Sequence, residues 1–246
     1  MGIHSFVDAV YVLSVRSFDD RIAHMQREMA RHGIAFEFVF EFDPGSIPDE
    51  VLHRVFGDSP MKLPHKSLVL KHIETWRRCV ERGQQRVLVF EDDAILAPGF
   101  APTFARACAE ADRLGGAYMV YLGCGDNRYT AAPPGDSCLV AAGPLPAADA
   151  LLFNQEAARR RLAWLESHRA GLTADWLLRQ IDAQQGIVHY WLRDPIVFQG
   201  SMDGTFTSVL DDKRRARGRG YAWLRFRWNR LRFRFLGGRR VREPGR

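Results

Sequence analysis

Apolar runs alternate with amphipathic stretches along the first half of the chain. Residues 9–15 and 86–90 are near-continuous apolar runs of strand length, and residues 117–122 repeat the pattern. Such runs are typical of strands that are covered on both faces, as in a parallel sheet. Phenylalanines at alternate positions from 36 to 42 predict a further strand in the same region.

Apolar residues at helical spacing predict three helices between and after these strands. The first is expected to begin at a cap on Asp19, the second at a cap on Ser67, and the third covers about residues 100–114. Short strand and helix candidates continue to about residue 198. This alternation predicts an α/β fold in which helices cover both faces of a mostly parallel sheet.

The composition is that of a protein with a real core, since 46% of its 246 residues are hydrophobic. The opening residues lack the features of a signal peptide, and no apolar run is long enough to span a bilayer. The cysteines are far apart and form no CxxC pair, so we expect free thiols in a reducing cytosol and a cytoplasmic protein. They are Cys79, Cys108, Cys124 and Cys138.

Charge is distributed unevenly between two parts of the chain. Residues 213–246 hold 14 basic residues against one acid, a net charge of +13, whereas the remaining 212 residues have a net charge of −7. We therefore expect one α/β domain over residues 1–210 and a separate basic, aromatic tail over residues 211–246.

The tail has the pattern of a helix that lies on a membrane. Leu224, Trp228, Leu231 and Phe235 recur at helical spacing and are flanked by arginines. Such a helix inserts its aromatic side chains and keeps its arginines at anionic headgroups, which would place the protein peripherally on the cytoplasmic face of the inner membrane. The same residues also alternate as in a strand, so a disordered end and a site for single-stranded nucleic acid are the alternatives, nucleic acid being the least favoured.

Three consecutive acids, Glu91, Asp92 and Asp93, follow the strand predicted at residues 86–90. Ligands of open α/β sheets bind beyond the carboxyl ends of the strands. Carboxylates so close together repel one another unless a divalent cation lies among them, and oxygen ligands suit Mg²⁺ or Mn²⁺. Such an ion would stabilise the charge on a departing diphosphate. A solvated acidic turn is the alternative.

Six segments between about residue 10 and residue 210 have a recognisable order. They are VYVLSVRSFDDR, KHIETW, VLVFEDDAIL, ADALLFNQEAARRRL, TADWLL and DPIVFQGS. With these segments in this order, the chain resembles glycosyltransferase family 25, the group of lipooligosaccharide and collagen galactosyltransferases with a GT-A-like fold. The resemblance implies a nucleotide-sugar donor, commonly UDP-galactose, a saccharide or lipid-linked saccharide acceptor, and inversion at the anomeric carbon.

Residue roles follow from the resemblance for the acidic run and two arginines. Asp93 is implied as the direct metal ligand, while Glu91 and Asp92 would hold donor hydroxyls or share the ion. Arg16 and Arg21 match arginines that could pair with the diphosphate. An exposed loop base and a first-turn helix residue are the plainer interpretations of these two arginines.

The sequence departs from the family in the helix before the acidic run. Where the family usually has Ser-His, this chain has Lys71-His72. His72 is carried over as a donor-binding residue, although it could equally be a structural histidine. Lys71 would either supply another phosphate-binding charge or indicate a different donor.

An inverting transferase also needs a general base, and Asp175 is our candidate, with Trp176 beside it as a sugar-stacking face. Alternatively, Asp175 only favours the dipole of a helix capped by Thr173. His189 is either a further metal ligand or structural. Further candidates are Gln199 and Ser201 for the site and Asp126 and Asn127 for the acceptor.

Motifs of rival chemistries are missing from the sequence. There is no Gly-rich dinucleotide turn, Walker A sequence or GxSxG elbow. Two other classes of function stay open: a catalytically silent relative of the family that acts as a binding module, and a nucleic-acid-binding protein that uses its tail.

Overall fold

The structure is a computed structural model, and most of the chain between residues 2 and 203 is described in it. Asp126 and Asn127, the acceptor candidates, lie outside the described residues. The described residues are 2–123, 129–130, 136–141, 143, 147–203, 205–206, 220–221, 223–225, 227–229, 231–232 and 239–240.

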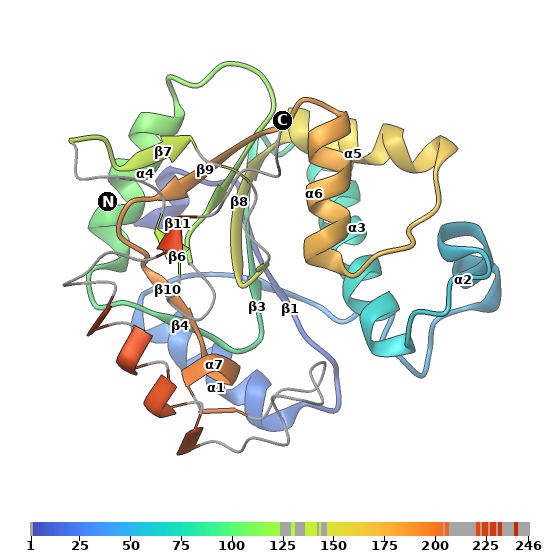
Figure 1. The fold of residues 1–246 in the computed structure, drawn as a ribbon, viewed down its shortest axis with the longest axis horizontal. Helices are drawn as coiled ribbons and strands as arrows, with labels where there is room; N and C mark the ends of the chain where they lie inside the picture. Colours follow the sequence, from blue (N-terminus) through green and yellow to red (C-terminus); the bar gives the residue numbers. More distant parts are fainter. Residues whose placement is uncertain are drawn as a thin grey trace.

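The centre of the fold is a seven-stranded sheet with the strand order β2-β1-β3-β8-β5-β9-β7 (Figure 1). Five of its strands run in one direction, and β8 and β7 run in the other. The prediction of a mostly parallel sheet is therefore confirmed. The strands are β1 (Ala9–Leu13), β2 (Glu37–Val39), β3 (Arg86–Glu91), β5 (Tyr118–Tyr121), β7 (Leu139–Ala141), β8 (Ala150–Asn154) and β9 (Val188–Leu192).

Helices cover both faces of the sheet, as predicted (Figure 1). Side chains of α2, α3, α5 and α6 pack on one face around Trp76, and those of α1 and α4 pack on the other around Phe104. The helices are α1 (Asp19–Arg31), α2 (Asp49–Phe56), α3 (Leu63–Glu81), α4 (Phe100–Ala111), α5 (Gln155–Ser167), α6 (Ala174–Gln184) and the short η1 (Ile3–Ser5) and α7 (Gly200–Asp203).

Two small sheets lie beside the central one. In the first, β4 (Ala94–Leu96) pairs antiparallel with β10 (Val197–Gln199), which brings a late segment of the chain next to the acidic run. In the second, β11 (Arg239–Arg240) pairs with β6 (Tyr129–Thr130). The boundary between domain and tail at residue 210 stays a prediction.

Several element boundaries differ from the sequence-based expectations. Helix α3 begins at Leu63 rather than near Ser67, because Pro64 suits the first turn of a helix. Asp19 is the first residue of α1 rather than its cap. The strand predicted through residue 42 is only β2, which ends at Val39, and the backbone turns at residues 41–42, where Phe42 has a positive φ of 63°.

The described residues of the tail between 220 and 232 are helical. Apolar side chains there are exposed, at 50% for Tyr221, 63% for Leu224, 64% for Trp228 and 53% for Leu231. Within the part of the chain that the structure describes, no helix is both long and apolar enough to cross a membrane. Of the cysteines, Cys79, Cys108 and Cys138 are free and buried, as expected.

Candidate active site

The three acids of the run lie where the sheet opens at the carboxyl ends of its parallel strands. Glu91 is the last residue of β3, and Asp92 and Asp93 form the turn into β4. Strand β10 runs back along β4, and α7 follows it directly. The acidic run is therefore enclosed by a segment that lies about a hundred residues later in the chain.

Asp93 is held by the beginning of α7. The backbone N–H of Ser201 donates to Oδ2 of Asp93 over 3.0 Å, and that of Gly200 donates to its carbonyl oxygen over 2.7 Å. Gly200 has no room for a side chain, since a Cβ there would lie 2.7 Å from the Phe206 ring. The other carboxylate oxygen of Asp93, Oδ1, is buried and has no hydrogen-bond partner among the described residues.

Asp92 is engaged by two side chains from the first strand and helix. The hydroxyl of Ser14 donates to its Oδ2 over 2.8 Å, and the guanidinium of Arg21 pairs with its Oδ1. Burial raises the pKa of Asp92, and the charge of Arg21 opposes only part of that rise. Arg21 thus offsets part of the negative charge of the acidic run.

Glu91 accepts a hydrogen bond of 2.9 Å from the side-chain amide of Gln199. Burial and the negative charges of Asp93, Asp149 and Asp92 raise the pKa of Glu91 to about 8. Gln199 and Ser201, both expected to line the site, thus contact the acidic run directly.

A fourth acid, Asp149, belongs to the same cluster and was not singled out from the sequence. It precedes β8, and its carbonyl oxygen accepts the N–H of Glu91 over 3.0 Å. Burial, together with the charge of Asp93, raises the pKa of Asp149 to about 7, against the opposing effect of the N–H groups of Asp149 and Ala150. The available signal was an acid placed directly before the apolar run at residues 150–153, and a parallel-sheet interpretation treats such an acid as an ordinary loop residue.

The acidic cluster fits a divalent cation only in part. Among the residues that the structure describes, no group of three His, Cys, Asp or Glu side chains is arranged to hold a metal ion. Mg²⁺, however, is commonly bound by one or two carboxylates together with substrate phosphates and water. The unpartnered Oδ1 of Asp93 is suited to such a site, whereas Glu91 and Asp92 already have hydrogen-bond partners.

The two arginines that were expected to bind a diphosphate have different surroundings. Arg21 is partly buried and paired with Asp92. Arg16 is exposed, with its guanidinium 4.8 Å from the centroid of the Phe40 ring. Its backbone N–H donates to Asp43 over 2.9 Å, which ties the loop after β1 to the loop after β2.

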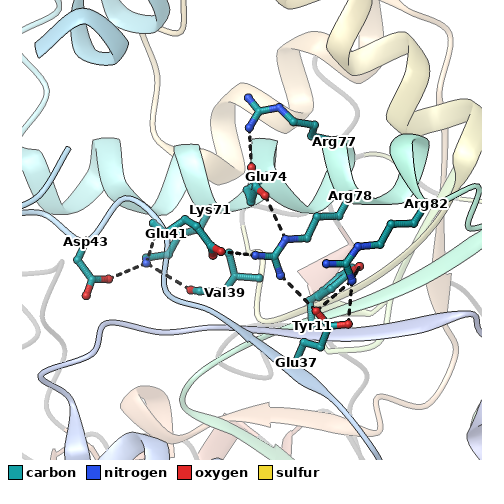
Figure 2. A network of polar contacts seen from close by, with 10 residues as sticks. All are labelled: Tyr11, Glu37, Val39, Glu41, Asp43, Lys71, Glu74, Arg77, Arg78 and Arg82. Atoms are coloured by element: carbon teal, nitrogen blue, oxygen red, sulfur yellow. Dashed lines mark hydrogen bonds and ion pairs between the residues drawn. The ribbon is translucent and has the colours of Figure 1, made fainter. Parts of the chain in front are cut away.

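Lys71 is buried and fixes the loop that follows β2 (Figure 2). Its ammonium group donates to the carbonyl oxygens of Val39 and Glu41 and to a carboxylate oxygen of Asp43, over 3.3, 2.8 and 2.8 Å. All three donor hydrogens of Lys71 are thus used inside the protein, so the structure favours a positioning role over a phosphate-binding one.

The same network continues from this loop along α3 (Figure 2). Arg78 pairs with Glu41 and Glu74, and Arg82 pairs with Glu37. The loop after β2 is therefore attached to α3 at several points. The hydrogen bond from the backbone N–H of Arg16 to Asp43 attaches Arg16 to this loop as well.

His72 lies inside the helix layer rather than among the acids. It is 2% exposed, and its Nε2 has no hydrogen-bond partner among the described residues. Burial, together with the positive charge of Arg161, lowers the pKa of His72 to about 3. The imidazole is therefore neutral, and this placement agrees with the structural interpretation of His72.

Asp175 lies in the first turn of α6, where it accepts a hydrogen bond of 2.8 Å from Thr173. Because α6 leads into β9, which runs parallel to β5, the helix begins at the carboxyl edge of the sheet. Trp176 is 48% exposed, and the guanidinium of Arg179 lies 5.1 Å from its ring centroid. Asp175 and the acidic run are thus at the same edge.

His189 takes part in a buried ion network. Its Nε2 lies 2.7 Å from Asp182, which also accepts hydrogen bonds from Nε and Nη2 of Arg161 over 2.8 and 2.7 Å. Burial alone would raise the pKa of Asp182, but the charge and hydrogen bonds of Arg161 and the hydrogen bond with His189 lower it. The structural interpretation of His189 agrees with this arrangement, because its Nε2 is engaged by Asp182.

Comparison with known proteins identifies related sequences. The sequence profile of Glycosyltransferase family 25 (LPS biosynthesis protein) matches residues 7–131, half of the chain. The chain is 30% identical over 97 residues to the lacto-N-neotetraose biosynthesis glycosyltransferase LgtB of Neisseria meningitidis, covering 36% of this chain and 34% of that protein. It is 25% identical over 128 residues to a glycosyltransferase 25 family member of Aedes aegypti, covering 48% and 21%.

The chain spans about a fifth to a third of the length of the curated relatives that it matches. Among solved structures, a glycosyltransferase involved in glycosylation of the major capsid of PBCV-1 is similar, with a TM-score of 0.40 and 9% identity. That alignment covers 88% of this chain and 99% of the other.

Proposed function

The chain belongs to glycosyltransferase family 25, and we propose that it is an inverting glycosyltransferase. It transfers a sugar, galactose in our proposal, from a nucleotide-sugar donor such as UDP-galactose. The acceptor is a saccharide or lipid-linked saccharide of lipooligosaccharide or another surface glycan.

A single observation carries this proposal: a buried cluster of acids at the carboxyl ends of the parallel strands, in which Asp93 keeps one carboxylate oxygen without a partner. An unpartnered buried carboxylate is costly, and a fold retains it where a ligand supplies the missing partner. The backbone N–H of Ser201 orients the other oxygen, so Asp93 is preorganised to receive that ligand.

Mn²⁺ or Mg²⁺, held by Asp93 and the donor's diphosphate, would stabilise the negative charge on the departing nucleoside diphosphate. Asp92, fixed by Ser14 and Arg21, and Glu91, fixed by Gln199, would hold donor hydroxyls at the edge of the cluster. The exposed guanidinium of Arg16 would pair with the diphosphate in this proposal.

Asp175 is proposed as the general base, since it lies at the same edge of the sheet as the acidic run. Its carboxylate would take the proton of the acceptor hydroxyl as that oxygen attacks the anomeric carbon. The exposed ring of Trp176 next to it offers an apolar face for a sugar of the acceptor.

The test is a thermal-shift screen of nucleotide sugars with and without Mn²⁺, on the wild type and on Asp93→Asn. We expect stabilisation by one donor that requires Mn²⁺ and is lost in Asp93→Asn but kept in Glu166→Gln, an exposed acid on α5. If no nucleotide sugar raises the melting temperature, the transferase proposal is wrong, and the binding-module alternative gains support.

The tail supports a second proposal, peripheral attachment to an anionic membrane on the cytoplasmic face of the inner membrane. Tyr221, Leu224, Trp228 and Leu231 follow one another at intervals of three, four and three residues, which places them on one helical stripe. All four are about half exposed or more. With Arg225 and Arg232 near the stripe, the surface suits an anionic bilayer, where lipid-linked saccharides also lie.

A further inference from the structure

Asp149 is the least satisfied polar side chain of the acidic cluster. Asp149 is fully buried, and neither of its carboxylate oxygens has a hydrogen-bond partner of normal geometry among the described residues. The backbone N–H groups of Asp149 and Ala150 favour its charged form but make no hydrogen bond of normal geometry with it. Burying a carboxylate without partners costs several kcal/mol. A cation bound beside the proposed donor site would supply the missing partner and offset this cost.

The pairing of strands aims Asp149 toward the acidic run. Phe90 of β3 pairs with Ala150 of the antiparallel β8, and the next pair along the ladder is Glu91 with Asp149. Side chains of directly opposite residues point to the same face of a sheet. Asp149 therefore shares a face with Glu91, and the charge of Asp93 is near enough to contribute to the raised pKa of Asp149.

Gly123, which follows β5, leaves the space that the Asp149 carboxylate occupies. A Cβ at position 123 would lie 1.9 Å from Oδ2 of Asp149 and 3.0 Å from the carbonyl oxygen of Val197. Any side chain at this position would displace the carboxylate. The buried carboxylate oxygens without hydrogen-bond partners among the described residues are Oδ1 of Asp93 and both oxygens of Asp149.

We propose that Asp149 is the second carboxylate ligand of the divalent cation, together with Asp93, in a site completed by the donor's diphosphate and water. This inference rests on the proposed transferase function. Two carboxylates with substrate phosphates form a sufficient ligand set for Mg²⁺ or Mn²⁺, and they neutralise the charge of the ion. Asp149 then supplies the second free carboxylate, which Glu91 and Asp92 do not because they already have hydrogen-bond partners.

The test measures Mn²⁺ binding rather than turnover, by loss of the electron paramagnetic resonance signal of free Mn²⁺ in the presence and absence of UDP. We expect Asp149→Asn, which keeps the shape of the side chain, to weaken Mn²⁺ binding at least tenfold. Asp93→Asn should do the same, and Glu166→Gln should bind Mn²⁺ as the wild type does.

Gly123→Ala is a second variant that leaves every proposed ligand in place. Its methyl group displaces the Asp149 carboxylate, so we expect a similar loss of Mn²⁺ affinity while circular dichroism shows an intact fold. Wild-type affinity in Asp149→Asn, or a wild type that binds no Mn²⁺ even with UDP, overturns the inference. Donor stabilisation that persists in EDTA would leave the transferase proposal standing in either case.

Discussion

The backbone N–H of Ser201 donates to Oδ2 of Asp93 over 3.0 Å, across 108 positions of sequence. This bond attaches the turn after β3 to the beginning of α7, and it fixes which oxygen of Asp93 remains available. The orientation of the proposed metal ligand thus depends on a backbone donor that only a substitution by proline at position 201 removes.

Ser201→Pro should therefore weaken donor binding, whereas Ser201→Ala should not. Proline removes the N–H, and a hydrogen bond to a charged group is worth about 1.5–3 kcal/mol, or roughly ten- to a hundredfold in affinity. Isothermal titration of the nucleotide sugar with Mn²⁺ present measures the difference. Equal affinities in the two variants would show that the bond does not organise Asp93.

Lys71→Met should destabilise the protein, because it leaves Asp43 and the carbonyl oxygens of Val39 and Glu41 without their donor. Removing one partner of a buried ion pair costs about 3–5 kcal/mol. Urea denaturation should show this loss for Lys71→Met and little change for Lys66→Met, which lies nearer the start of the same helix α3. If Lys71 served the donor instead, stability would be kept and only donor affinity would fall.

Asp175→Asn should lower kcat by about 10²–10⁴-fold, the range expected for loss of a general base, and leave donor binding unchanged. The acid lies in the first turn of α6 and makes its hydrogen bond with Thr173, so the amide should preserve the local structure. Steady-state kinetics with a soluble acceptor, alongside the thermal shift with donor, separate the two effects. A variant with unchanged kcat would exclude Asp175 as the base.

Stability should fall with acid because of His72. Its pKa is lowered to about 3 in the folded protein by burial, against an ordinary value of 6.5. Above pH 6.5 the imidazole is neutral in the folded and in the unfolded protein, so His72 does not lower the free energy of unfolding. Between pH 6.5 and 3 only the unfolded chain takes up the proton, so stability falls by about 1.4 kcal/mol per pH unit.

His72→Gln should flatten that part of the pH profile, measured by urea denaturation between pH 7 and 4. His65→Gln, on the same helix, is the matched control and should keep the slope of the wild type. An unchanged slope in His72→Gln would assign the acid sensitivity to other groups.

Membrane binding should depend on the apolar stripe of the tail. Replacing Trp228 and Leu231 by serine should lower co-sedimentation with vesicles that contain anionic lipid by at least tenfold, since each buried side chain contributes about 1.5–3 kcal/mol. Trp223→Ser, off the stripe and stacked on Arg227, should bind nearly as the wild type does.

Deleting residues 213–246 should move the protein from the membrane to the soluble fraction and keep activity on soluble acceptors. Unchanged fractionation would remove the membrane proposal. Binding to single-stranded nucleic acid in place of vesicles would favour the rival interpretation of the tail.

Hydrophobic periodicity alone determined the α/β class, the strand that ends at the acidic run and the two-layer covering of the sheet. These features follow from local burial, which the sequence encodes at strand and helix spacing. The motif order also indicated the family, and hence the importance of Asp93. Periodicity does not encode strand direction, however, so the antiparallel β8 between β3 and β5 was not foreseen.

The partners of the acids were decided by tertiary structure. Whether Lys71 meets a phosphate or the loop after β2, and whether His72 faces the site or the core, depends on how α3 packs against residues distant in sequence. Asp149 is a candidate metal ligand only because β8 lies next to β3 and because Gly123 leaves room for its carboxylate. The sequence alone determined the acidic run, and only long-range packing determined which of its oxygens remain available to a ligand.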